Sequence, residues 1–129
     1  MTRFALLFIA AAVATGLAAP AGAQDRPRED ELARLLEGRE AGPPVRCVNQ
    51  RLARTTRIVN GTAFVYRIGN ILYVNRPRLG AETLDRRYAL VTRRRSSLLC
   101  AGDPVQSTDL YSGITKLVIP DDFIPYHRR

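Results

Sequence analysis

The sequence predicts a mostly β domain: a small antiparallel meander that closes into a barrel or sandwich, with one short N-terminal helix. Two dipeptides carry this prediction, Asn60-Gly61 and Gly69-Asn70, because hairpin turns favour residues that adopt positive φ. The segments around them, Thr55–Val59, Thr62–Ile68 and Ile71–Arg76, are rich in the β-branched and aromatic residues that strands prefer. We therefore expect three consecutive antiparallel strands.

The register of this meander follows if both turns contain two residues. Val59 then pairs with Thr62, and Ile68 pairs with Ile71. One face of the sheet then carries Ile58, Ala63, Val65, Leu72 and Val74, and the other carries Phe64, Tyr66, Ile68, Ile71 and Tyr73, with Arg57 and Asn75 beside Phe64. Neither face is polar, so each must be covered, or one must receive a ligand.

The face with Phe64, Tyr66, Tyr73 and Arg57 is the candidate binding surface of this sheet. Aromatic rings beside an Arg suit the stacking of nucleic-acid bases, but nucleic acid is disfavoured as a partner because an exported protein meets little of it. The alternative is that these aromatic side chains belong to the core, and the sequence favours the core.

A short helix is expected from Asp30 to Glu40. Its three leucines fall on one helical face, and acidic residues crowd its start, where the helix dipole favours them. A helix of this length is marginal by itself, so it either docks through its leucines or frays. Gly42-Pro43-Pro44 ends the helix, and residues 24–44 form the helix and a linker.

Further strands are expected beyond Pro77, where short apolar segments alternate with turns. They cover Tyr88–Arg93, Leu98–Cys100, Val105–Leu110 and Ile114–Ile119.

The first residues have the three parts of a secretory signal peptide. Met1 to Arg3 are positively charged, Phe4 to Leu17 are apolar or small, and Ala21 and Ala23 stand where signal peptidase requires small residues. We expect cleavage between Ala23 and Gln24, so that residues 1–23 are the signal peptide and residues 45–129 the β domain. The apolar run is shorter than the ~20 residues that span a bilayer, and no transmembrane segment is expected after cleavage. The expected location is the periplasm or the outside of the cell.

Two cysteines, Cys47 and Cys100, remain after this cleavage. In an oxidising compartment they predict one structural disulfide, which stabilises the fold by roughly 4 kcal/mol in the chain-entropy model. A redox-active or metal-binding pair is the alternative. Neither cysteine belongs to a Cys-x-x-Cys unit and His127 is the single histidine, so we expect no metal site and no cofactor.

The chain is basic, with 20 Lys and Arg against 12 Asp and Glu and a formal net charge of +8. Expected loops hold the candidate anion-binding residues Arg86, Arg87, Arg93, Arg94 and Arg95. If these loops come together, they suit the phosphates of lipid headgroups or of lipopolysaccharide. The alternative, which the composition favours, is that this charge serves only solubility.

Residues able to transfer protons or attack a substrate are scarce. His127 belongs to a terminal Tyr-His-Arg-Arg that is expected to be mobile. Nothing selects a catalytic pair of carboxylates from Glu82, Asp85, Asp103, Asp109, Asp121 and Asp122. Phosphate-binding loops and nucleophile elbows are absent from the sequence. We therefore assign no catalytic residue and disfavour an enzyme.

Several short motifs follow one another in a recognisable order: Cys47, Asn60-Gly61-Thr62, Tyr73-Val74-Asn75-Arg76, Leu99-Cys100 and Asp103-Pro104-Val105. On these motifs, over residues 45–126, the chain resembles a family of short, uncharacterised exported proteins of Gram-negative bacteria. Some relatives carry further cysteines that this chain lacks. The resemblance implies export and a β fold, and it brings no activity and no catalytic residue.

The leading hypothesis is an exported, non-enzymatic β domain that acts in envelope structure or protein interaction, with envelope proteins as partners. The second hypothesis is a module that binds an anionic ligand or membrane surface through the Arg-rich loops. A hydrolase of unrecognised type is the third.

Overall fold

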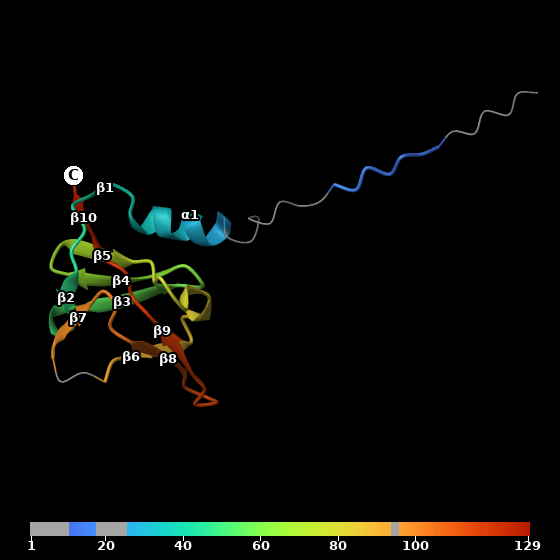
Figure 1. Ribbon diagram of the computed structural model, residues 1–129. Helices are drawn as coiled ribbons and strands as arrows, with labels where there is room; N and C mark the ends of the chain where they lie inside the picture. The colour runs from blue at the N-terminus through green and yellow to red at the C-terminus, as the bar shows by residue number, and fades with distance from the viewer. Residues whose placement is uncertain (1–10, 18–25, 94–95) are drawn as a thin grey trace, which may run out of the picture.

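The computed structural model describes residues 11–17, 26–93 and 96–129 (Figure 1). The fold is mostly β and antiparallel, and α1 is the one α-helix of these residues, as the sequence predicts. In chain order the elements are α1 (Arg26–Leu35), β1 (Arg39–Ala41), β2 (Cys47–Asn49), η1 (Gln50–Leu52), β3 (Thr55–Val59), β4 (Ala63–Ile68), β5 (Ile71–Asn75), η2 (Ala81–Thr83), β6 (Tyr88–Val91), β7 (Leu98–Cys100), β8 (Val105–Asp109), β9 (Thr115–Val118) and β10 (Ile124–Arg128).

The described strands form three sheets. The largest has five strands in the order β1-β10-β5-β4-β3, a second has the order β6-β8-β9, and the third is the pair β2-β7. The described strands do not close into a barrel, because each sheet keeps two edges. The two larger sheets pack on one core. The prediction of a mostly antiparallel β domain is therefore confirmed, but the strands do not form a barrel.

The predicted meander is present as β3, β4 and β5, but one of its two turns differs from the prediction. Ile68 pairs with Ile71 across the two-residue turn Gly69-Asn70, as expected. Val59 pairs with Ala63 instead of Thr62, which shifts β3 by one residue. Only Gly61 has positive φ in this turn, at 67°, and the Thr62 N–H closes it by donating to the Val59 carbonyl at 3.0 Å.

This shift moves every side chain of β3 to the opposite face. Ile58 now pairs with Phe64, whereas Arg57 pairs with Val65 on the other face. The prediction that Arg57 lies beside Phe64 is therefore wrong. The cause is a contact distant in sequence: the Asn60 side chain accepts a hydrogen bond from the Arg86 N–H at 2.9 Å, which holds Asn60 outside a two-residue turn.

The N-terminal helix begins and ends earlier than predicted. It covers Arg26–Leu35 rather than Asp30 to Glu40, and Gly38, with φ of 73°, turns the chain into β1. Arg39 and Glu40 belong to that strand, which pairs with β10. The leucines do dock the helix: Leu32 is 1% exposed, and Leu35 and Leu36 are packed beside it.

The C-terminal residues form a strand, so the expectation of a mobile tail is also wrong. β10 lies between β1 and β5, with Glu40 opposite His127 and Tyr73 opposite Pro125. Pro125 lacks an N–H, and a sequence pattern therefore reads this segment as irregular. Its pairing depends on two strands that come from distant parts of the chain.

The five-stranded sheet is covered on both faces, as its apolar pattern requires. On one face, Phe64 and Tyr66 join Phe123 in a core that includes side chains of both smaller sheets. On the other face, Leu32 of α1 packs over a second cluster that contains Val65 and Val74. Figure 1 shows these layers, with α1 on one side of β3–β5 and the β6-β8-β9 sheet on the other.

Candidate functional site

An open hollow lies between the edges of two different sheets. β3 is the last strand of the five-stranded sheet, and β6 is the first strand of the β6-β8-β9 sheet. Thr56, Ile58, Tyr88, Ala89 and Leu90 of these strands line an open cleft of about 460 Å³. Neither strand has a partner on the side that faces this cleft.

One end of the cleft is fixed by the segment that leads into β6. The Gly61 N–H donates to the Leu84 carbonyl at 2.8 Å, and the Arg86 N–H donates to the Asn60 side chain. The Arg86 Nε also donates to the Ile58 carbonyl at 3.4 Å. That bond shows that the Ile58 carbonyl points away from β4 and toward the cleft.

Arg86 also connects this end of the cleft to the helix. Its Nη2 forms an ion pair with Glu31 Oε1 of α1. The guanidinium thus lines the cleft, caps an outward-pointing carbonyl and holds a helical carboxylate. Both side chains of the pair keep substantial exposure, 56% for Arg86 and 35% for Glu31, so the ion pair is open to exchange with a ligand carboxylate.

Tyr66 contributes the aromatic wall of the cleft. Tyr66 is 6% exposed, and burial raises the pKa of its hydroxyl to about 12. Like any phenol, the hydroxyl is neutral at physiological pH and can donate a hydrogen bond. No hydrogen bond joins it to another residue within the described parts of the chain, and it lies at the cleft rather than fully enclosed.

The predicted aromatic face is divided between core and surface. Phe64 and Tyr66 belong to the core with Phe123, and the Phe64 and Tyr66 rings meet edge to face at 5.5 Å. Tyr73 is half-buried at the margin of the same core. Arg57 lies on the helix side of the sheet, where Leu35 and Val65 surround it, and it reaches the cleft only at the exposed edge of β3.

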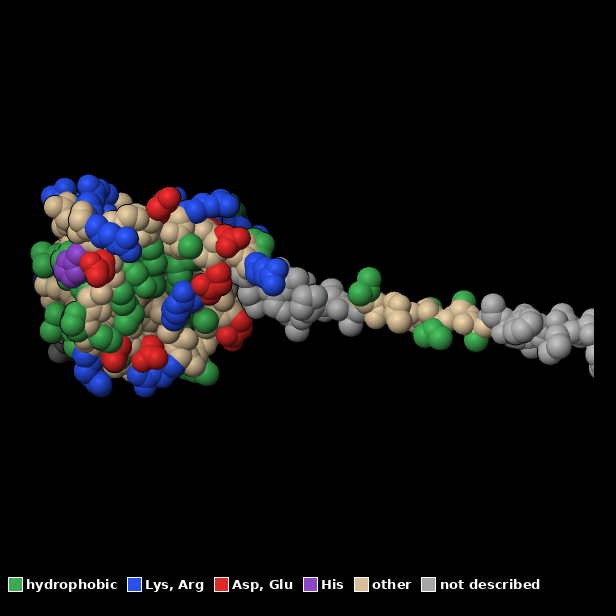
Figure 2. All heavy atoms as spheres, turned by 90° about the horizontal axis from the view of Figure 1, so that it is seen from above, with side chains coloured by type: hydrophobic (Ala, Val, Ile, Leu, Met, Phe, Trp, Pro, Cys, Tyr) green, Lys and Arg blue, Asp and Glu red, His purple; other side chains and the backbone are tan. Residues whose placement is uncertain are grey.

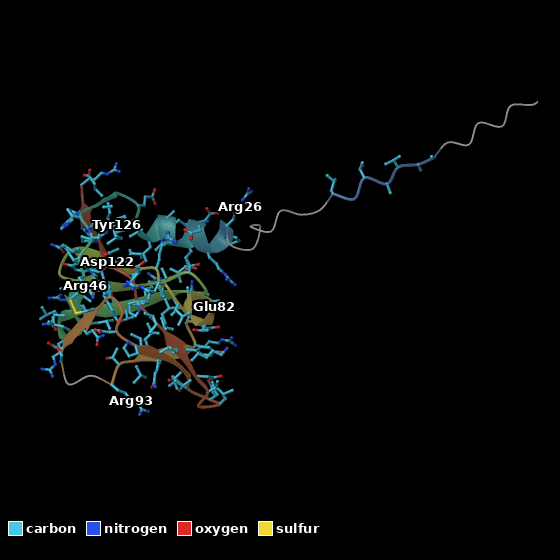
Figure 3. All side chains as sticks on the ribbon, in the orientation of Figure 1. Arg26, Arg46, Glu82, Arg93, Asp122 and Tyr126 are labelled. Carbon is cyan, nitrogen blue, oxygen red and sulfur yellow. A yellow bond between two sulfur atoms is a disulfide. The ribbon has the colours of Figure 1, made fainter. Side chains whose placement is uncertain are left out.

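The predicted anion-binding arginines are placed at the two ends of β6. Arg86 and Arg87 precede the strand, whereas Arg93 follows it on a separate loop (Figure 3). Arg94 and Arg95 lie outside the described residues. Arg87 is held by Asp85, with Nη2 and Oδ2 2.9 Å apart, and this hydrogen bond lowers the pKa of Asp85 to about 2.

Charges of both signs are mixed on the face that carries α1. Figure 2 shows blue and red side chains interspersed around apolar ones on that face. The ion pair between Arg76 and Glu29, with 2.7 Å between Nη1 and Oε1, ties α1 to the end of β5. Ion pairs with carboxylates are thus formed by four arginines of the described residues, Arg76, Arg78, Arg86 and Arg87.

Cys47 and Cys100 form the predicted disulfide. They stand directly opposite each other in the antiparallel pair β2–β7, with an S–S distance of 2.05 Å. The bond joins the strand before the meander to the strand after β6, as the sequence predicts. The described residues contain no group of three or more His, Cys, Asp or Glu side chains placed to hold a metal ion.

Comparison of the chain with protein-family models, with curated proteins and with solved structures found no match. Across the described ranges, no helix has both the length and the apolar character to cross a bilayer. The disulfide fits a periplasmic or extracellular protein.

Sequence reasoning missed the cleft because its two walls are far apart in the chain. β3 and β6 were both predicted as strands, but neither was identified as an edge. One signal in the sequence could have indicated it: β3 begins with three consecutive polar residues, Thr55, Thr56 and Arg57, and the structure shows that all three are exposed.

Proposed function

We propose that the chain is an exported, disulfide-linked β domain that binds a partner protein, and that the cleft between β3 and β6 receives an extended, acidic segment of that partner. One observation carries this proposal. Two unpaired sheet edges border the same cleft, and an extended peptide can hydrogen-bond to such an edge as an added strand.

The backbone of β3 supplies the first element of recognition. Because the Ile58 carbonyl points into the cleft, the alternation of an antiparallel strand makes the N–H and carbonyl of Thr56 point the same way. Thr56 is exposed, and no strand pairs with β3 on that side. Main-chain pairing of this kind gives affinity for an extended shape rather than for one sequence.

The side chains of the cleft supply the selectivity for an acidic segment. Arg57 and Arg86 line the cleft, and its lining contains no Asp or Glu. A ligand carboxylate would replace Glu31 on Arg86 and restore a charge-assisted hydrogen bond. The neutral Tyr66 hydroxyl offers a further donor at the same site.

The carboxylates give less support to a hydrolase. A general acid needs a raised pKa, yet hydrogen bonds lower the pKa of the described carboxylates that are shifted. Arg87 acts on Asp85, the Tyr111 N–H acts on Asp109, and the Asp122 N–H acts on Asp121. Each of these groups is held ionised by bonds that serve the fold.

Export is part of the proposal and has its own test. The disulfide fits an oxidising compartment, and the N-terminal pattern predicts a cleaved signal peptide. Expression in a Gram-negative host should give a periplasmic protein that begins at Gln24, as mass spectrometry of the purified chain would show. Recovery of the working protein from the cytosol with its N-terminus intact would contradict export.

The peptide proposal is tested by titration of the isotopically labelled protein with two peptide libraries, monitored by amide chemical shifts. Both libraries consist of short peptides rich in Val and Thr, one with a central Glu and the other with a central Lys. The Glu library should shift the amides of Thr56, Ile58 and Leu90 and should bind at least about tenfold more tightly. N-methylation of the peptide backbone should abolish binding, because it removes the pairing with β3.

Two variants make this test specific. Arg86→Gln should reduce the preference for Glu over Lys, since it removes the guanidinium that receives the carboxylate. Arg78→Gln is the matched control, because Arg78 also pairs with a surface carboxylate, Asp121, but does not line the cleft. Shifts that map away from β3 and β6, or an equal loss in both variants, would reject the cleft as the peptide site.

A further inference from the structure

The end of the β8–β9 hairpin carries an unusual amount of exposed apolar surface. Eight large apolar side chains of residues 26–93 and 96–129 are notably exposed: Leu52, Leu79, Val91, Leu98, Leu110, Tyr111, Ile114 and Leu117. Four of them, Leu110, Tyr111, Ile114 and Leu117, lie on this one hairpin, and Tyr111 is 96% exposed. Such local concentration marks a surface that contacts something other than water.

This surface is convex. The hairpin extends from the β6-β8-β9 sheet on the side of the domain opposite α1, and its tip is the farthest point of the domain in that direction (Figure 1). Leu110 and Tyr111 precede Gly113 in the turn, and Ile114 follows it. A protein partner would need a pocket shaped for this tip, whereas a lipid interface accommodates a protruding apolar turn without a matching shape.

Four backbone N–H groups of the turn are bonded within the turn itself. The Tyr111 and Ser112 N–H groups both donate to Asp109 Oδ1, at 2.9 and 3.4 Å. The Gly113 N–H donates to the Asp109 carbonyl at 2.8 Å, and the Ile114 N–H donates to Ser112 Oγ at 3.3 Å. These four donors therefore need no water, which lowers the cost of moving the turn out of bulk water into a lipid interface.

The charges near the tip suit an anionic surface. Lys116 is exposed on β9 two positions beyond Ile114, and Arg87 precedes Tyr88, which pairs with Asp109. Asp109 Oδ1 accepts the Tyr111 N–H inside the turn, which lowers the pKa of Asp109, and Arg87 forms its ion pair with Asp85. The whole chain is strongly basic, with a formal net charge of +8, so approach to anionic headgroups is favoured at any orientation.

We propose that the tip formed by Leu110, Tyr111 and Ile114 inserts into the boundary between headgroups and acyl chains of an anionic bilayer. Tyrosine suits this depth, because its ring is apolar and its hydroxyl remains among the headgroups. Lys116 then meets a lipid phosphate. This surface is separate from the cleft between β3 and β6, and neither proposal depends on the other.

The experiment uses a reporter that the sequence makes unambiguous. The chain contains no tryptophan, so Tyr111→Trp gives a single indole at the tip, at a position exposed enough to accept it. The variant protein, recovered from the periplasmic extract, is mixed with vesicles of phosphatidylethanolamine and phosphatidylglycerol. We expect a blue shift of the indole emission and quenching by lipids brominated near the headgroup end of the acyl chain.

Leu52→Trp is the matched reporter, because Leu52 is also highly exposed, at 60%, but lies in η1 away from the hairpin. Its indole should show neither the blue shift nor the quenching. Equal quenching of both indoles would show that the protein adheres without inserting its tip and would overturn the proposal. Absence of vesicle binding at low ionic strength would overturn it as well.

A loss-of-function series completes the test. The triple variant Leu110→Ser, Tyr111→Ser, Ile114→Ser should bind these vesicles at least about tenfold more weakly, because it removes the apolar side chains that enter the lipid. The double variant Leu52→Ser, Leu98→Ser removes exposed apolar surface elsewhere and should bind like the parent protein. Vesicles of phosphatidylcholine alone should bind less in every case.

Other occupants of the tip give distinct results. If the tip binds a second copy of this chain, the triple variant lowers the mass measured by sedimentation while vesicle binding stays unchanged, and the lipid proposal fails. If the tip binds a protein pocket, the indole of Tyr111→Trp stays unquenched by brominated lipid, and the lipid proposal fails again.

Discussion

Asn75 and Asp121 are joined by two hydrogen bonds, although the chain between them contains all three strands of the β6-β8-β9 sheet. Asn75 Nδ2 donates to the Asp121 carbonyl at 2.6 Å, and Asn75 Oδ1 accepts from the Asp121 N–H at 3.1 Å. Asn75 ends β5 and is fully buried, at 0% exposure. This single side chain therefore fixes the place where the chain leaves β9 and returns beside β5 as β10.

Replacing Asn75 should be costly because the Asp121 backbone would lose both of its partners. We expect Asn75→Ser to lower the free energy of unfolding by about 2–3 kcal/mol. Asn70→Ser, at the exposed turn between β4 and β5, should change it by less than about 0.5 kcal/mol. Urea denaturation of both variants measures the difference, and similar costs would show that the Asn75 amide does not anchor this segment.

Alanine at Gly80 should lower the stability of the fold more than alanine at Gly102, which has a similar backbone conformation. Gly80 and Gly102 have φ of 82° and 87°, so alanine strains both. A Cβ on Gly80 would also lie 2.2 Å from the Leu117 carbonyl oxygen of β9, whereas a Cβ on Gly102 would meet nothing within 4 Å. We expect Gly102→Ala to cost about 1 kcal/mol and Gly80→Ala at least about 1 kcal/mol more. Equal midpoints of thermal unfolding would contradict the close approach.

The sequence was sufficient where structure depends on neighbouring residues. The Gly69-Asn70 turn, the pairing of Ile68 with Ile71 and the division of β4 and β5 into two apolar faces follow from local turn chemistry and alternation. Helical periodicity placed the three leucines on one face but left open whether the helix docks or frays, and the burial of Leu32 shows that it docks. The disulfide follows from the number of cysteines and the expected compartment.

The sequence was insufficient where distant segments determine the result. The shift of β3 depends on the bond from Arg86 to Asn60, and β10 exists because β1 and β5 flank a segment that contains proline. The cleft has the same origin, since only the fold reveals that β3 and β6 are edges. The apolar tip was missed for another reason. Leu110 and Ile114 were predicted as strand ends, and only the structure shows that both are exposed.

Loss of the disulfide should weaken the domain without removing its topology. Cys47 and Cys100 are separated by 53 positions, and release of that constraint costs about 4 kcal/mol in the chain-entropy model. The double variant Cys47→Ser, Cys100→Ser should therefore unfold at a clearly lower urea concentration with a similar circular dichroism spectrum. Thiol counting on the native protein without reductant should find no free cysteine, and two free thiols would contradict the bond.

Tyr66 should make stability fall at alkaline pH. Its pKa is about 12 in the folded chain because of burial, against about 10 in the unfolded chain. Between these values the unfolded chain releases the phenolic proton while the folded chain keeps it, so the free energy of unfolding decreases as pH rises. The contribution is complete below pH about 10, and about 1.4 kcal/mol is lost for each pH unit within this window.

The variant Tyr66→Phe removes this titration and keeps the ring in the core. From pH 9 to pH 11 the parent protein should therefore lose about 1 kcal/mol more stability than the variant, measured by urea denaturation at each pH. Ultraviolet absorbance should show one phenol of the folded protein ionising near pH 12, and that step should be missing in the variant. Parallel pH profiles of the two proteins would mean that the Tyr66 hydroxyl is solvated in the cleft and that burial does not raise its pKa.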